Sequence, residues 1–127
     1  MNMRRVVVTD YTFPDLDRER KAAIAAGCEF EAHQCRSADE IAEALRGATV
    51  GVVQFGTVNQ AAIDGLGENA ALIRYGIGFD NIDVAAASAR NVPVGYVPDY
   101  CPNEVADHTC AAMLTLLRKL SPLDASV

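Results

Sequence analysis

The segment ALIRYGIGFDNIDVAAASARNVPVGYV, residues 71–97, contains one complete strand–loop–helix–strand unit. Its first four residues are mostly apolar and predict a short buried strand. The alanine-rich run at 81–89 predicts a helix, and residues 92–97 predict a second strand, in which Pro93 favours an edge or a first position. Because parallel strands need a crossover connection, this unit predicts a parallel pair.

The same alternation extends back to the N-terminus. In chain order, the predicted elements are strands at 5–9, 28–33, 50–53, 71–74 and 92–97 and helices at 16–26, 38–46, 59–66 and 81–89. Residues 28–33 alternate apolar and polar side chains, which predicts a strand at a sheet edge. Ser37 and Glu40 have the spacing of a capping box, in which each side chain accepts the other residue's backbone N–H. Five strands separated by helices predict a flavodoxin-like, doubly wound parallel sheet of order 2-1-3-4-5, with a ligand crevice at the carboxyl ends of the first and third strands.

A longer helix is predicted over 102–120. Pro102 suits the first helical position, and Ser121–Pro122 are expected to end the helix. Apolar or small side chains recur on one face, namely Val105, Thr109, Ala112, Met113, Leu116, Leu117 and Leu120. We therefore expect a domain over 1–101, a helix over 102–120 and a tail over 121–127. An apolar face without a partner predicts a homodimer through this helix, and the alternative is a helix that folds back over its own sheet.

Composition limits the classes of partner. The chain has 127 residues, 50% of them hydrophobic, which suits one domain with a real core. Its formal charge of −6 and the lack of any basic run disfavour nucleic acid and anionic membranes. No apolar stretch approaches the roughly 20 residues that span a bilayer. The four cysteines match no metal or redox spacing, so we expect a soluble, cytoplasmic protein with free thiols and no metal site.

The glycine loop at 76–81 is the most informative local feature. It follows a predicted strand directly and opens a predicted helix. Glycines permit positive φ and let successive N–H groups point into one space, which suits a carboxylate or a phosphate. The alternative is a tight structural turn. Asn81 stands where the full dinucleotide fingerprint has glycine, so that fingerprint is absent here.

Four motifs follow one another in a characteristic order and spacing: RYGIGFDNID at 74–83, NVPV at 91–94, VPDYC at 97–101 and EVADHT at 104–109. Together they resemble the N-terminal, substrate-binding domain of the D-isomer-specific 2-hydroxyacid dehydrogenases. The opening VVVTDYTFPD, residues 6–15, is similar to a bacterial branch that resembles the C-terminal-binding-protein transcriptional corepressors.

The resemblance implies a set of site residues. In the intact protein it implies hydride transfer between NAD or NADP and a small 2-hydroxy or 2-oxo acid. It implies that the loop of Gly76, Ile77 and Gly78 offers backbone N–H groups to the substrate carboxylate. It also implies substrate contacts from Gln54, Phe55, Gly56 and Tyr100 and cofactor contacts from Val105 and Thr109, for which hinge packing is the alternative. Phosphoglycerate-type relatives usually carry Arg at the position of Gln54, which disfavours a phosphorylated substrate.

The departure from the family concerns its second domain. Such enzymes carry there a GxGxxG loop, an acidic ribose ligand, and the Arg, Glu and His that act on the substrate. None of these is found in residues 1–127, so we expect a truncated substrate-binding domain that is inactive alone and binds no cofactor tightly. The alternative is a standalone, non-catalytic module that binds a small carboxylate or a protein partner.

Overall fold

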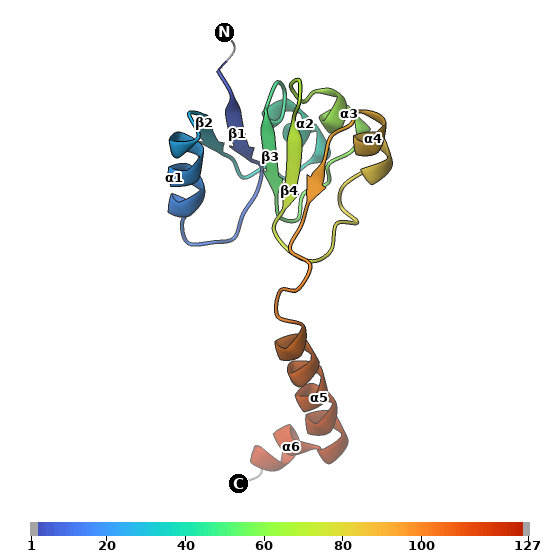
Figure 1. Cartoon of the computed structure of the whole chain (residues 1–127). Coiled ribbons are helices and arrows are strands. Elements are labelled where there is room, and N and C mark those ends of the chain that lie inside the picture. Colours follow the sequence, from blue (N-terminus) through green and yellow to red (C-terminus); the bar gives the residue numbers. More distant parts are fainter. Residues whose placement is uncertain (1–2, 126–127) are drawn as a thin grey trace.

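The computed structural model describes residues 3–125, which form a five-stranded, all-parallel sheet of order β2-β1-β3-β4-β5 (Figure 1). The strands are β1 (Arg5–Val8), β2 (Glu29–Ala32), β3 (Val50–Val53), β4 (Ala71–Arg74) and β5 (Val94–Gly95). The helices are α1 (Asp17–Ala25), α2 (Ala38–Ala44), α3 (Gln60–Asp64), α4 (Val84–Ala89), α5 (Pro102–Arg118) and α6 (Leu120–Asp124). The predicted strand order is confirmed, as are the edge positions of β2 and of the strand that follows Pro93.

The central strands are apolar on both faces, because each face of the sheet carries its own core. Val7, Val53 and Leu72 belong to the larger core, together with apolar side chains of α2, α3 and α4. Val8 and Val52 point to the opposite face and pack with residues around the start of α1. Figure 1 shows α1 apart from the other three helices of the domain, which gather on the other side of the sheet. Fully burying a side chain of this kind contributes about 1.5–3 kcal/mol.

Helix α5 extends away from the sheet (Figure 1) and contains no buried residue. The alternative in which this helix folds back over its own sheet is therefore wrong. One consequence is seen on β4, where Ile73 on the α1 side is 43% exposed. Among residues 3–125, no helix is long and apolar enough to cross a membrane.

Helix α2 starts at Ala38 as predicted, but its capping box differs from the expected one, and α4 starts later than predicted. Ser37 Oγ accepts the N–H of Glu40 at 3.2 Å, as predicted, but the Glu40 carboxylate accepts the N–H of Arg36 at 2.7 Å and not that of Ser37. Because the backbone of Ser37 is extended, the Glu40 carboxylate bonds to the N–H of the residue before Ser37. The helix predicted from residue 81 begins at Val84, because the backbone of 81–83 pairs with Val58 instead.

The C-terminal helix also ends differently. It stops at Arg118, and Lys119 adopts a left-handed conformation with φ 53°. Ser121 and Pro122 do not end it but lie inside the short helix α6. A proline is tolerated in the first turn of a helix, where its missing N–H has no helical partner to lose.

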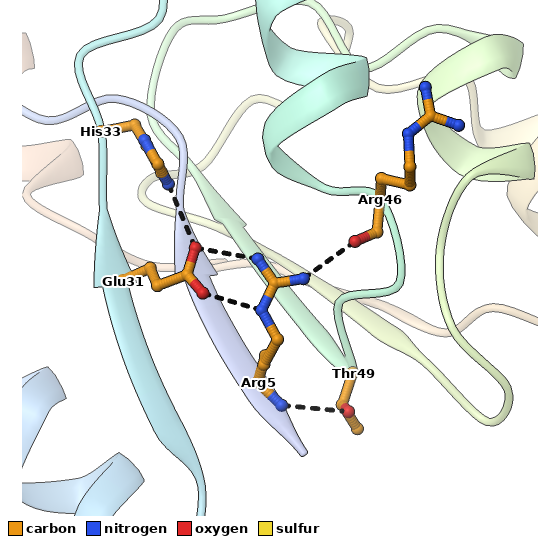
Figure 2. A network of polar contacts seen from close by, with 5 residues as sticks. All are labelled: Arg5, Glu31, His33, Arg46 and Thr49. Atoms are coloured by element: carbon orange, nitrogen blue, oxygen red, sulfur yellow. Dashed lines mark hydrogen bonds and ion pairs between the residues drawn. The ribbon is translucent and has the colours of Figure 1, made fainter. Parts of the chain in front are cut away.

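An ionic network joins β1, β2 and the end of α2 (Figure 2). The Arg5 guanidinium donates from Nε and Nη2 to the two carboxylate oxygens of Glu31 at 2.7 and 2.8 Å, and from Nη1 to the carbonyl of Arg46 at 2.9 Å. The ring of His33 lies 3.4 Å from Glu31. The hydrogen bond from Arg5 is the main cause that lowers the pKa of Glu31.

We predict that Glu31→Gln lowers the free energy of unfolding at pH 7 by about 0.5–1 kcal/mol, since both partners are partly exposed and solvent screens the pair. Because the pair lowers the pKa of Glu31, its contribution is complete above the usual carboxyl value of 4.5 and is lost as the pH falls through the folded-state pKa. Urea unfolding at pH 7 and at pH 3.5 measures both effects.

Glu29→Gln is the matched control. Glu29 lies beside Arg5 in the register of β1 and β2, but its carboxylate interacts with Arg5 only through its charge and not through a hydrogen bond. Its effect should be smaller than that of Glu31→Gln. A difference between Glu31→Gln and wild type that persists unchanged at pH 3.5 would contradict the assignment.

Candidate functional site

The candidate site lies at the carboxyl ends of the strands, where the strand order reverses between β1 and β3. In open parallel sheets this is the place at which connecting loops diverge and leave a crevice. Figure 1 shows the loops that follow β1 and β4 at the same end of the sheet from which the chain passes to α5.

Asp10 follows β1 and is 8% exposed. Its Oδ2 accepts the backbone N–H groups of Phe55 at 2.6 Å and Gly56 at 3.1 Å. Its Oδ1 accepts the N–H of Gln54 at 3.2 Å and the hydroxyl of Thr9 at 2.8 Å. We call residues 54–56 the β3 turn. Its three N–H groups are thus satisfied inside the protein and are not free to bind a ligand.

The β3 turn requires glycine at position 56. A Cβ there would collide with Ile41 of α2 and would lie 3.2 Å from the Asp10 carboxylate. The side chain of Gln54 is also used internally: its Oε1 accepts the N–H of Thr12 at 2.7 Å. That bond holds the loop after β1 against β3, and in this loop Phe13 packs edge-on against the ring of Tyr75.

Tyr75 is a neutral group at this site. Its hydroxyl donates to Glu19 of α1 at 3.0 Å. Burial, and then the bond to Glu19, raise the pKa of Tyr75 far above its usual range. The phenol therefore stays protonated near neutral pH and cannot serve as a general base.

The glycine loop is anchored at both ends. Gly76 has φ 140°, its N–H donates to the carbonyl of Arg74, and its own carbonyl accepts the N–H of Val97 at 3.0 Å. Phe79 packs edge-on against Tyr96, with ring centroids 5.1 Å apart.

At its far end the loop is tied to the β3 turn. The Nδ2 of Asn81 donates to the carbonyl of Gly56 at 2.8 Å. In the part of the chain that the structure describes, the N–H groups of Ile77 and Gly78 have no hydrogen-bond acceptor.

Arg74 lies beside this loop, and the sequence analysis placed it at a strand end and in the motif at 74–83 without giving it a role at the site. Its guanidinium lies against Gly76 so closely that any Cβ at that position would collide with it. Its Nε is buried and, within residues 3–125, has no hydrogen-bond partner. The guanidinium places a positive charge beside the loop, which favours an anion there.

A cavity of about 300 Å³ lies next to the loop. It is lined by Phe13, Gln54, Tyr75, Gly76, Val97 and Tyr100. Three of the predicted site residues, Gln54, Gly76 and Tyr100, are thus brought together. Two others, Phe55 and Gly56, line a separate cavity of about 290 Å³ toward α2.

The remaining predicted residues lie outside both cavities. Ile77 and Gly78 are exposed at the rim of the loop. Val105 and Thr109 lie on α5, where the Thr109 hydroxyl donates to the carbonyl of Val105 at 2.7 Å. The structure therefore does not bring these two residues together with the substrate-binding candidates.

The two histidines, His33 and His108, lie outside the two cavities described above. Cys35 lines the smaller one, and burial, followed by the nearby carboxylates of Glu40 and Asp10, raises the pKa of its thiol. Within the described residues, no cluster of three or more His, Cys, Asp or Glu side chains could hold a metal ion.

Solved structures share the fold. An acyclic imino acid reductase in complex with NADPH and D-Arg superposes with a TM-score of 0.79 at 21% identity, over 96% of this chain and 39% of that one. D-lactate dehydrogenase from Aquifex aeolicus, complexed with NAD and lactic acid, gives a TM-score of 0.76 at 20% identity, over 94% of this chain and 35% of that one. At these identities the likeness shows the fold alone.

Sequence relatives are more specific. D-3-phosphoglycerate dehydrogenase of Methanocaldococcus jannaschii is 31% identical over 98% of this chain and 23% of its own length. Glyoxylate reductase of Pyrococcus furiosus is 42% identical over 40% of this chain and 16% of its own length. The chain thus spans a quarter or less of these curated relatives. The family model for the D-isomer specific 2-hydroxyacid dehydrogenase catalytic domain matches residues 6–119. The chain therefore belongs to the D-isomer specific 2-hydroxyacid dehydrogenase family.

Proposed function

We propose that this chain binds the carboxylate of a small 2-hydroxy or 2-oxo acid at the rim of the glycine loop. The observation that carries this proposal is the pair of N–H groups of Ile77 and Gly78, which have no acceptor within the described residues and lie in the loop against which the Arg74 guanidinium packs. A carboxylate offers acceptors to both kinds of donor, and bonds to a charged group are stronger than neutral ones. The remainder of the acid would occupy the cavity of about 300 Å³.

The chemistry of the cavity favours a small acid without a phosphate group. Its walls are largely aromatic and aliphatic, from Phe13, Tyr75, Val97 and Tyr100. Gln54 adds no positive charge, and its amide is already engaged with Thr12. The cation that lies against Gly76 of the loop is Arg74.

For the intact protein we propose hydride transfer between NAD or NADP and such an acid, with residues 1–101 as the substrate-binding domain. The cofactor supplies the hydride chemistry when bound. Residues of this chain do not fit a dinucleotide by themselves: Val105 is exposed, and the Thr109 hydroxyl is bonded to its own helix. We therefore propose that 102–120 joins two domains and that 121–127 leads into the second. The free cysteines support a reducing compartment, the cytoplasm.

A non-catalytic module is the second candidate. It is favoured by two large side chains at the site, since Phe55 is 66% and Tyr100 65% exposed. Exposed aromatic residues of this kind are typical of protein interfaces. The mass of the native protein separates the candidates, because a dehydrogenase of this family needs a chain more than twice as long, whereas the module needs only these residues.

We predict that oxamate binds the chain with a Kd in the millimolar range or weaker, because the few donors must compete with water. Amide NMR should show shifts confined to residues 54–57 and 76–81. Lactamide, a neutral amide of similar size, is the matched ligand and should leave these resonances in place. Gly76→Ala should abolish the shifts, since its Cβ would displace the Arg74 guanidinium.

Absence of shifts at about 50 mM oxamate, well beyond a millimolar Kd, would exclude this carboxylate site. Equal shifts with lactamide would show that the site does not recognise the charge.

A further prediction concerns turnover of 2-oxo acids. The pure 127-residue chain should not oxidise NADH in the presence of pyruvate or glyoxylate, because neither histidine lines the candidate cavities and the raised pKa of Tyr75 keeps its phenol from acting as a base near neutral pH. Loss of absorbance at 340 nm measures the reaction. Turnover above a heat-inactivated control, for any of several 2-oxo acids, would overturn this expectation.

We further propose that the chain is a homodimer through α5. Leu116 is 78% exposed, and Val105, Met113 and Leu117 are each at least half exposed along the same helix. Removing apolar surface from water is favourable by about 25 cal/mol per Å², so a helix with this face bare is expected to associate. A twofold pairing or an exchange of helices would cover it.

Static light scattering at micromolar concentration should give the mass of a dimer, and Leu116→Asp should give that of a monomer. Ile24→Asp is the matched control, because it places the same charge at another exposed apolar position, on α1. This control should remain dimeric. A monomeric wild type, or a dimer that survives Leu116→Asp, would exclude the α5 interface.

A further inference from the structure

We propose that Asp10 is a positioning residue for the carboxylate site, although it does not face the ligand. This inference rests on the proposed function. Asp10 fixes the β3 turn by accepting three of its backbone N–H groups, those of Gln54, Phe55 and Gly56. Its carboxylate is thus an internal anion, and the turn has no free N–H left for an external one.

The β3 turn is hydrogen-bonded to two other parts of the site, the loop after β1 and the far end of the glycine loop. Through the side chain of Gln54 it holds Thr12 and the loop that carries Phe13 into the cavity. Through the carbonyl of Gly56 it holds Asn81, at the far end of the glycine loop. The position of the Ile77 and Gly78 N–H groups relative to the cavity therefore depends on where Asp10 holds the turn.

Burial makes Asp10 sensitive to small chemical changes. Both carboxylate oxygens accept two donors each, and the residue is 8% exposed. An asparagine of the same size carries an NH₂ group at one of the two positions, so a donor would face donors. If the NH₂ took the place of Oδ1, Thr9 could turn its hydroxyl to accept, but the N–H of Gln54 would lose its partner. In the place of Oδ2, it would leave Phe55 and Gly56 without an acceptor.

The test measures oxamate binding and amide exchange in Asp10→Asn. We expect a Kd for oxamate about three- to tenfold weaker than in wild type, the range that coupled residues outside a site produce. We also expect exchange of the Gln54 N–H, or of the Phe55 and Gly56 N–H groups, to accelerate about tenfold. Leu45→Ala is the matched control. Leu45 is fully buried at the C-terminal end of α2, so its truncation should destabilise the fold without removing a hydrogen bond to the β3 turn. Its oxamate Kd should equal that of wild type.

Each outcome separates the two proposals. A Kd in Asp10→Asn within twofold of wild type overturns the positioning role and leaves the carboxylate site standing. A weaker Kd in Leu45→Ala as well would overturn it too, because loss of stability alone would then explain the effect. If the wild-type chain does not bind oxamate, the site and the positioning role fall together.

A measurement on the wild-type chain covers the case in which Asp10→Asn does not fold. The N–H groups of Gln54, Phe55 and Gly56 should exchange with solvent more slowly than those of Ile77 and Gly78, which have no acceptor in the described structure. Equal exchange rates for the two sets would overturn the role given to Asp10.

Discussion

The carboxylate of Asp10 is the interaction on which the end of the sheet depends. It joins the end of β1 to the turn after β3, the two strands between which the order of the sheet reverses. The partner N–H groups belong to backbone that has just left a strand. The buried N–H of Gln54 would otherwise lack an acceptor, at a cost of about 1–3 kcal/mol, and those of Phe55 and Gly56 are partly buried. Gly56 follows from the same constraint, because a side chain there would separate the turn from α2.

Much of the fold could be predicted from periodicity. The runs VVV at 6–8 and VGVV at 50–53 have no polar side chain, as expected for strands covered on both faces, and the two cores confirm that reading. The direction of α5 could not be predicted, because an amphipathic pattern identifies an apolar face but not what covers it. The start of α4 was placed three residues early, since the pairing of 81–83 with Val58 is a contact between distant segments that local pattern does not reveal.

Local pattern alone predicted the candidate site only at the glycine loop, whereas the family resemblance also pointed to Gln54 and Tyr100, which line the cavity. Glycine at 76 pointed to the loop, and its φ of 140° confirms the need for it. Gln54, which was expected to contact the substrate, lines the cavity, but its side-chain amide is hydrogen-bonded to Thr12. Asp10 and Arg74 are single charged residues at strand ends and leave no periodic signal. Phe55, whose N–H bonds to Asp10, lies 45 residues further along the chain, and only folding brings the two residues together.

The two edges of the sheet have a consequence for how this molecule meets others. Along β2 the outermost strand carries Glu29 and Glu31, and at the other side β5 is only two residues long and follows a proline. Charge, shortness and a missing N–H each discourage a foreign strand from adding to a sheet. The two edges therefore offer little backbone for an intermolecular ladder, so that neither the pairing of strands between molecules nor growth into cross-β aggregates is favoured there.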